Sequence, residues 1–172
     1  MLLDGSDWRK YFDAMERDAW RLETHPVCTM PQEEEAIRRF RAGEPVTAAD
    51  TAAWTERLEG YRRTGRTVGR VHVITRPLTE YLRFEFAHYR HNVGAGEDVR
   101  ILDLTDQENP GLPGQDFWIF DDSRVVLMNY RSDGTQINRE VLDGDPRPYL
   151  EWKQLALARS VPFLEYVESM GE

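Results

Sequence analysis

The sequence is short of several residues on which common classes of protein depend. Its 172 residues include one cysteine, Cys28, so neither an intrachain disulfide nor a cysteine-based zinc site can form. No apolar run approaches the roughly 18 residues of a membrane-spanning helix, and no signal-peptide core follows Met1. We therefore expect a cytoplasmic protein without a membrane partner, a metal or a cofactor.

Lysine is almost absent, because Lys10 and Lys153 are the only two in the chain. The formal net charge is −9, which disfavours direct nucleic-acid binding, since phosphate neutralisation requires a cationic surface. Residues 57–100 differ from the rest, with nine basic groups, all arginine, against five acidic groups. Arginine suits bidentate recognition of carboxylate or phosphate. The simpler interpretation is a general preference for arginine over lysine.

The composition favours one globular domain spanning residues 1–172. Hydrophobic residues make up 40% of the chain and aromatic residues 11%, which suffices for a packed core and argues against global disorder. A chain of this length buries about two-thirds of the surface that its unfolded form exposes. We find no internal repeat and no long linker.

The first half of the sequence alternates between helical and strand patterns. Apolar residues at helical spacing predict an amphipathic helix over residues 7–22. An extended stretch follows at 24–31, and helices are predicted over 32–42, from a Thr47 or Asp50 cap to about 64, and over 80–93 with Thr79 as N-cap. Strands are predicted at 70–75 and 99–104. This order is typical of an α/β unit with parallel strands.

The second half follows a different pattern. Three alternating segments at 116–120, 124–130 and 135–142 are separated by short turns, which predicts a β-meander. A helix is predicted over 148–161, and a helical turn is predicted for the short tail, 162–172. The expected fold is therefore α/β or α+β, with a mixed sheet, N-terminal helices, a central strand–helix–strand unit, a C-terminal β-meander and a closing helix.

The arginine-rich centre suggests an anion site. Arg76 directly precedes a helix N-terminus, where backbone N–H groups and the helix dipole favour anions. The strand before it carries Arg70 and His72, whose side chains are expected to point to the same side as Arg76. The predicted ligand-binding set is Arg70, His72, Arg76, Arg83 and His91. The competing interpretation is a group of surface arginines paired with the many carboxylates of the chain.

The helix over residues 80–93 carries a polar face that contains Tyr81, Glu85 and His88. In an enzyme, Glu85 would orient His88 or raise its pKa, giving a general acid/base pair beside Tyr81. The blander interpretation is a polar face that makes buried or interface hydrogen bonds. The Glu85-x-x-His88 spacing matches half of a di-metal motif, but the second half is missing.

Two further groups of reactive side chains are better interpreted as structural. Cys28 follows His25 closely, but a packed or loop thiol is more common than a nucleophilic pair. Asp121 and Asp122 could bind a divalent cation together with Asp116 and Asp133, but such sequences are ordinary turn signals, because aspartate bonds its own backbone.

The run TRPLTEYLRFEFAHYRHNVGAGEDVRIL, followed by DFWIFDD and RVVLMNY, resembles an uncharacterised actinobacterial family. The resemblance covers roughly Phe12 to Tyr166. Members of that family are often encoded beside helix-turn-helix regulators, which implies a regulatory partner. A more distant similarity, in the order of a helix, a strand and a later hairpin, is to phospholipase-D-like half-domains. The His-x-Lys signature of that superfamily is absent, so its chemistry is not expected.

Three functions follow from these observations. The first is a non-enzymatic regulatory module that binds a ligand or partner and acts with a helix-turn-helix regulator. The second is an enzyme for a small phosphorylated or carboxylated substrate, with Glu85 and His88 as acid and base. The third is an antitoxin-like or nucleic-acid-mimicking acidic protein. The expected partners are the regulator, a small anionic ligand and, through exposed aromatic residues, a second copy of the chain.

Overall fold

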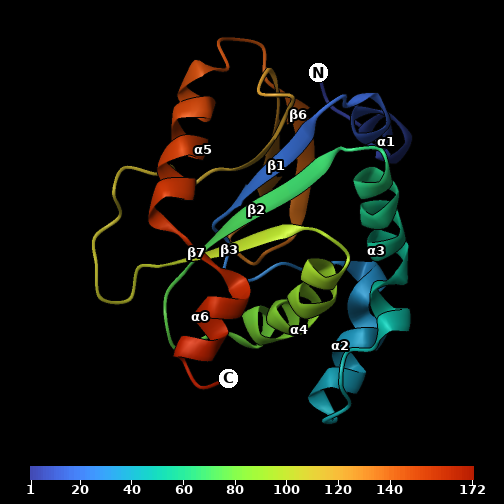
Figure 1. The fold of residues 1–172 in the computed structure, drawn as a ribbon, viewed down its shortest axis with the longest axis vertical. Coiled ribbons are helices and arrows are strands. Elements are labelled where there is room, and N and C mark those ends of the chain that lie inside the picture. Colours follow the sequence, from blue (N-terminus) through green and yellow to red (C-terminus); the bar gives the residue numbers. More distant parts are fainter.

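A seven-stranded mixed sheet forms the middle of the molecule in the computed structural model, which describes residues 1–172 (Figure 1). The strands lie in the order β6-β5-β4-β1-β2-β3-β7, with β1, β2 and β3 parallel and the other neighbours antiparallel. The predicted mixed sheet is thus confirmed. The strands are β1 (Asp18–Glu23), β2 (Thr67–Ile74), β3 (Asp98–Asp103), β4 (Asp116–Phe120), β5 (Arg124–Tyr130), β6 (Gln136–Val141) and β7 (Val161–Pro162).

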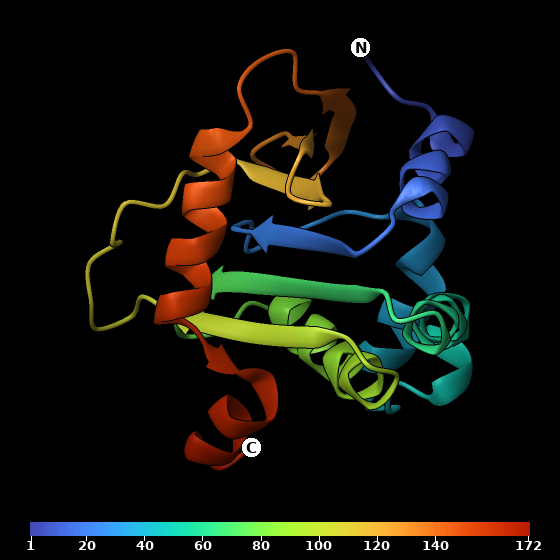
Figure 2. The ribbon, with the colours of Figure 1, turned by 45° about the horizontal axis from the view of Figure 1, so that its top comes forward.

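Helices cover both faces of this sheet. Helix α5 crosses one face, whereas α1, α3 and α4 lie on the other, as the two ribbon views show (Figures 1 and 2). None of the helices combines the length and apolar character needed to cross a bilayer. The helices are α1 (Gly5–Ala14), α2 (Glu34–Arg41), α3 (Ala48–Arg63), α4 (Glu80–Gly94), α5 (Arg147–Arg159) and α6 (Phe163–Ser169), with a single 3-10 turn, η1 (Pro31–Glu33), before α2.

The helix predicted over residues 7–22 is wrong in its second half, because the chain leaves α1 after Ala14 and forms β1. The Asp121 carboxylate accepts hydrogen bonds from the backbone N–H groups of Glu16, Arg17 and Asp18 at 2.7–3.1 Å. These bonds satisfy the backbone where the helix has ended and the strand begins. Tertiary contacts thus override the local helical pattern. Such a pattern arises readily in a central strand, because apolar side chains are buried on both of its faces.

The remaining predicted elements of the chain are confirmed, with bounds that move by at most a few residues. The hydroxyl of Thr47 accepts from the N–H of Asp50, whose carboxylate accepts in turn from the Thr47 N–H, so α3 begins with a capping box. Thr79 caps α4 through the N–H of Leu82. The β-meander and the closing helix are also present, and all of these elements were predictable because their signals are local. The tail is the exception: in place of the predicted helical turn it forms β7, which pairs with β3 at the edge of the sheet, and the seven-residue helix α6.

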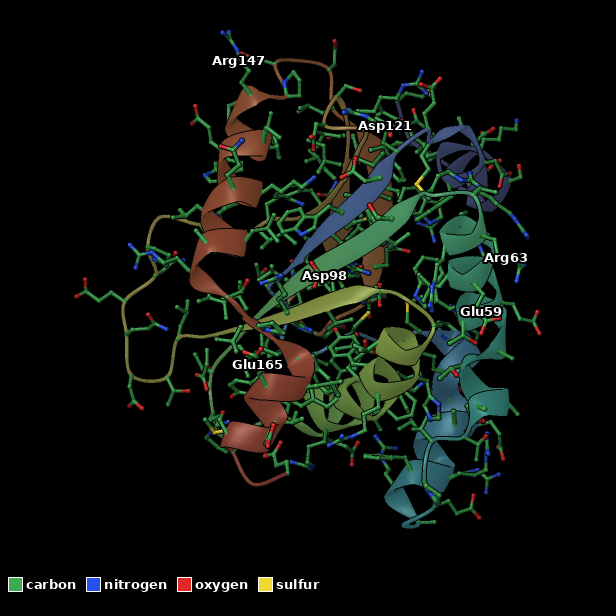
Figure 3. All side chains as sticks on the ribbon, in the orientation of Figure 1. Glu59, Arg63, Asp98, Asp121, Arg147 and Glu165 are labelled. Atoms are coloured by element: carbon green, nitrogen blue, oxygen red, sulfur yellow. The ribbon has the colours of Figure 1, made fainter.

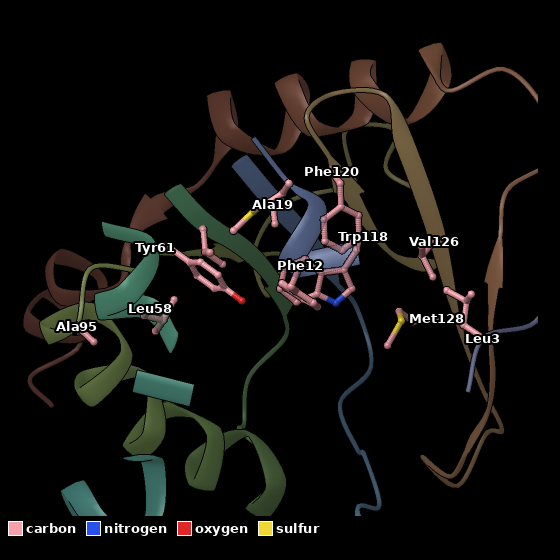
Figure 4. Packing of buried hydrophobic residues seen from close by; sticks show 12 residues of the cluster. Leu3, Phe12, Ala19, Leu58, Tyr61, Ala95, Trp118, Phe120, Val126 and Met128 are labelled. Carbon is pink, nitrogen blue, oxygen red and sulfur yellow. The ribbon is translucent and has the colours of Figure 1, made fainter. Parts of the chain in front are cut away.

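The largest apolar cluster fixes α1 and α3 to the sheet (Figure 4). Phe12 of α1 lies edge-on to Trp118 and Phe120 of β4, with ring centroids 5.0 and 5.1 Å apart. Leu58 and Tyr61 of α3 belong to the same cluster. Edge-to-face pairs of this kind add stabilisation beyond their buried area. These contacts fix α3, which belongs to the crossover from β1 to β2, against the sheet. The same crossover contains α2, which forms one wall of a pocket.

Candidate functional site

A buried cluster of charged side chains lies on the face of the sheet that α4 covers. Arg21 and Glu23 of β1 stand beside Arg70 and His72 of β2 in the parallel register. The Arg70 guanidinium donates to Glu23 at 2.5 Å, and through two nitrogens to Glu97 at 2.7 and 3.0 Å. All of these side chains are buried or nearly so. Charge-assisted bonds of this geometry are among the stronger polar contacts in proteins.

Glu23 is the centre of this cluster. Its Oε2 atom lies 3.3 Å from Nδ1 of His72 and accepts from the hydroxyl of Tyr89 at 3.3 Å. Burial opposes ionisation of Glu23, but the charges of Arg21, His72 and Arg70 outweigh it and lower the pKa to about 2. Burial lowers the pKa of His72, although the charges of Glu23 and Asp116 oppose this shift. Glu23 is therefore a fixed negative charge within the core.

The loop that follows β1, residues 24–30, begins at this cluster and is called the β1 loop below. The backbone N–H and the hydroxyl of Thr24 donate to Asp116 Oδ1 at 2.8 and 2.6 Å. The His25 ring donates to the same oxygen at 3.3 Å. Asp116 is the first residue of β4 and is almost fully buried. The sheet therefore fixes the direction in which the β1 loop leaves it.

The far part of the β1 loop is held by two other elements. The hydroxyl of Thr79 donates to the carbonyl of Pro26 at 2.6 Å and also caps α4. The N–H of Thr29 donates to the carbonyl of Gly134 in the turn between β5 and β6, at 2.9 Å. These contacts bring three distant parts of the chain together around one segment.

A pocket of about 580 Å³ opens between the β1 loop, α2 and the first turns of α4. Arg41 of α2 donates to Glu80 of α4 at 2.7 Å, which ties two of its walls together. The lining combines apolar and charged side chains, namely Val27, Cys28, Thr29, Met30, Glu34, Ile37, Arg38, Arg41, Thr79, Glu80, Tyr81 and Phe84. A concave apolar surface with a few polar groups is the usual form of a small-molecule site.

Two carboxyl groups without hydrogen-bond partners lie next to this lining. Glu85, one helical turn beyond Tyr81, is 9% exposed and makes no side-chain hydrogen bond. The Oε2 atom of Glu33, in the turn before α2, is buried and also lacks a partner. Burial, together with the charges of Glu23 and Glu33, raises the pKa of Glu85 to about 8. Burial also raises the pKa of Glu33. Buried carboxyls with raised pKa values are a common mark of functional sites.

The predicted acid/base residues do not form one unit. Glu85 lies inside the protein towards Glu23, whereas His88 donates from Nδ1 to the carbonyl of Phe84 at 2.9 Å. No hydrogen bond or ion pair joins Glu85 to His88. Tyr81 lines the pocket, but Glu85 and His88 do not. A proton relay between these two groups therefore has no geometric basis.

The predicted ligand-binding residues are also separated. Arg70 and His72 both belong to the buried cluster. Arg76 donates instead to the hydroxyl of Tyr166 at 2.8 Å and to the carboxylate of Glu172. The other two bond main-chain carbonyls, Arg83 that of Leu78 and His91 that of Val46. Each of the three arginines in the set thus already has a protein partner.

The four aspartates considered as a cation site also separate in the fold. Asp121 and Asp122 adopt positive φ in the turn between β4 and β5, which confirms their turn role. Asp122 accepts from Lys153, and Asp133 accepts from the backbone N–H of Thr135. Asp116 holds the β1 loop. No group of three or more His, Cys, Asp and Glu side chains is placed to hold a metal ion.

The sequence patterns did not single out Arg21, Glu23 and Glu97 as site residues, and Asp116 was considered only as a cation ligand. The helix wrongly predicted up to residue 22 concealed the strand that carries the first two. A usable signal does exist, because charged residues alternate with apolar ones in Trp20–Glu23, and the same alternation occurs in Arg70–Val73. Charged side chains at period two within otherwise buried strands indicate a paired internal cluster.

A family model matches residues 6–168 and describes a domain of unknown function, DUF6879. The chain belongs to the DUF6879 family. A comparison with curated proteins finds no significant match. The match covers the whole sheet and every helix from α1 to α6 apart from their outermost residues, so the charged cluster and the pocket both lie within the DUF6879 domain.

Gly134 determines how closely the β5–β6 turn approaches the pocket in this DUF6879 domain. Its φ is +90°, and a Cβ there would lie 2.7 Å from the carbonyl oxygen of Val27. Gly134→Ala should therefore cost about 1–3 kcal/mol of unfolding free energy and displace the β1 loop. Urea denaturation measures the cost. Gly144→Ala, at an open position, is the control and should change little. Equal stability of the two variants would contradict this role.

Cys28 should react slowly with thiol reagents although it lines the pocket. Burial, with the charges of Glu85, Glu23 and Glu33, raises the pKa of this thiol to about 11 despite the opposing charge of Arg21. Thiolate is scarce at neutral pH under these conditions, which disfavours the nucleophilic Cys28–His25 pair. Labelling with iodoacetamide at neutral pH should be much slower in the native protein than in urea. Equal native and denatured rates would contradict the assignment.

Proposed function

We propose that this chain is a non-enzymatic regulatory module that binds a small ligand in the pocket between the β1 loop, α2 and α4. The observation that carries the proposal is the pocket itself. It has the size and the mixed lining of a ligand site, yet its walls contain neither Glu85 nor His88. Tyr81 offers aromatic surface. The charged groups of the lining are Glu34, Arg38, Arg41 and Glu80.

The anchoring of the β1 loop supports a regulatory role. One end of the loop bonds Asp116 on the sheet, and the middle bonds Thr79 on α4. Residues 27–30 of the same loop line the pocket. A ligand that moves this loop therefore acts on the sheet, on α4 and on the β5–β6 turn together. Differential contacts of this kind are what allow a ligand to shift a conformational equilibrium.

The proposed protein partner is a helix-turn-helix transcription regulator, which the sequence resemblance implies. In this account, the ligand-bound and ligand-free modules differ in their affinity for that regulator. Reciprocal linkage then requires that the regulator change the ligand affinity of the module by the same factor. This reciprocity provides a check that does not depend on knowing the target gene.

An enzymatic role is the second candidate, and one observation favours it. Glu85 has a pKa raised to about 8 by burial and by the charge of Glu23, so it carries a proton at neutral pH, as a general acid must. It lies one helical turn behind Tyr81, which lines the pocket. The acidic mimic of a nucleic acid remains a prediction from net charge alone.

The test is affinity purification from the native cell at low salt, followed by native mass spectrometry. Ile37→Trp fills the pocket from α2, and Glu59→Trp places the same bulk on the exposed side of α3 as a control (Figure 3). We expect the wild type and Glu59→Trp to retain a small molecule together with a stoichiometric helix-turn-helix protein. Ile37→Trp should lose the small molecule.

Two results would count against the proposed module. Identical ligand-free masses for the three proteins would remove the basis for a ligand site. Conversion of the retained molecule into a product by the wild type, abolished in Glu85→Gln, would establish the enzyme instead. Thermal unfolding of Ile37→Trp verifies that the variant is folded before either result is interpreted.

A further inference from the structure

A second, smaller hollow of about 250 Å³ lies between α4 and α6. The two helices lie side by side (Figures 1 and 2) and pack through Phe86 and Phe163, whose ring centroids are 5.3 Å apart. No residue lines both this hollow and the pocket described above. The hollow is smaller than most pockets for drug-sized ligands, so it suits a single ring or a short alkyl group.

The floor of the hollow is apolar. Leu78 and Ala87 are half-buried and supply its accessible surface, whereas Phe86 and Val167 are 6% and 3% exposed and close it from beneath. A small apolar group that settles here loses contact with water on one side, which favours its binding.

Two arginines of α4 flank this floor. Arg83 and Arg90 both line the hollow, both are exposed, and neither takes part in an ion pair. They are two helical turns apart, with Ala87 between them on the same stripe of the helix. Arg83 donates from Nη1 to the carbonyl of Leu78 at 2.9 Å, which uses one of its five N–H donors and leaves its charge uncompensated. Arg90 makes no side-chain hydrogen bond.

The only carboxylate in the lining is already neutralised. Glu172 accepts from Nη1 of Arg76 at 2.9 Å, and Arg76, which also donates to Tyr166, does not line the hollow. The lining therefore presents two free positive charges, those of Arg83 and Arg90, beside an apolar floor.

We propose that this hollow binds a phosphate monoester with a small apolar body, the phosphate lying between Arg83 and Arg90 and the body on Leu78 and Ala87. A phosphate dianion matches the charge of two guanidinium groups, and their planar forks suit its oxygens. This site is separate from the pocket between the β1 loop, α2 and α4, so the inference does not rest on the proposed function.

Calorimetric titration at low salt with phenyl phosphate, inorganic phosphate and benzyl alcohol tests the site. We expect phenyl phosphate to bind most tightly, because the other two probes lack either the ring or the charge. Arg83→Gln and Arg90→Gln should each weaken its binding by about tenfold or more, and the double variant should abolish it. Glu172→Gln should strengthen binding, since it removes the one acidic group of the lining. Arg63→Gln, an exposed arginine of α3 (Figure 3), is the control and should behave as the wild type.

Several results would overturn this inference. Phenyl phosphate that binds the double variant as well as the wild type would lie elsewhere on the protein. Loss of its binding in Ile37→Trp would place it in the other pocket. Equal affinity for benzyl alcohol would remove the role of the two arginines, and equal affinity for inorganic phosphate would remove the role of the apolar floor. Absence of phenyl phosphate binding would overturn the site itself, and a ligand retained from the native cell would still support the proposed function.

Discussion

Arg70→Ala should lower the free energy of unfolding by about 3–5 kcal/mol, because it leaves Glu23 and Glu97 buried without their common partner. Arg70 is 7% exposed, and its three hydrogen bonds to these carboxylates have lengths between 2.5 and 3.0 Å. Most of this loss comes from the two carboxylates that stay buried without a partner, because an intact buried ion pair itself adds little net stability. Urea denaturation near neutral pH is the measurement.

The matched control for this substitution is Arg63→Ala, on the exposed side of α3, which should change stability by less than about 0.5 kcal/mol (Figure 3). Acid titration gives a second readout. The folded pKa of Glu23 is about 2, below its ordinary 4.5, so its contribution is present above pH 4.5 and is lost as pH falls towards 2. Arg70→Ala should reduce that dependence. A loss below about 1 kcal/mol would contradict the account of the cluster.

Glu85→Gln should stabilise the protein, and the gain should grow with pH. The folded pKa of Glu85 is about 8 against an ordinary 4.5, so the folded state holds a proton that the unfolded state releases. Wild-type stability therefore falls as pH rises through this window, by about 1.4 kcal/mol for each pH unit. Glutamine keeps the shape of the protonated acid and does not titrate, so the free energy of unfolding of the variant should not show this fall with pH.

Denaturation curves of the wild type and Glu85→Gln at about pH 5, 7 and 9 measure this gain. The two curves should nearly coincide at the lowest pH and differ most at the highest. Glu59→Gln, on the solvent side of α3, should show no such divergence. A constant difference across this range, or a variant that is less stable at pH 9, would contradict a raised pKa of Glu85 in the folded protein.

Elements whose signals are local could be predicted from the sequence alone. The Thr47 and Thr79 caps place α3 and α4, because an N-cap hydroxyl acts within three residues. Strand β1 was missed because its start depends on Asp121, more than a hundred residues away along the chain. Trp20 and Leu22 also pack on the face opposite to Ala19, so a two-sided strand produced an apparently helical stripe.

The candidate site was less predictable than the fold for a similar reason. Its pocket is assembled from the β1 loop, α2 and α4, and no single segment contains its pattern. The polar face of the helix over residues 80–93 was identified, but Glu85 lies in the interior rather than on a recognition surface. The arginines selected for an anion are occupied by Glu97, Glu172 and a carbonyl group. Such partners emerge only when the chain is folded.

Backbone amide hydrogen exchange tests whether the pocket between the β1 loop, α2 and α4 is a ligand site. Exchange is compared between the wild type carrying the small molecule retained from the native cell and the same protein freed of that molecule by dialysis. We expect slower exchange with the ligand bound in residues 27–41 and 79–85, which contain the lining, and little change in α6. Unchanged exchange in both segments, or protection confined to another part of the protein, would contradict a ligand site in this pocket.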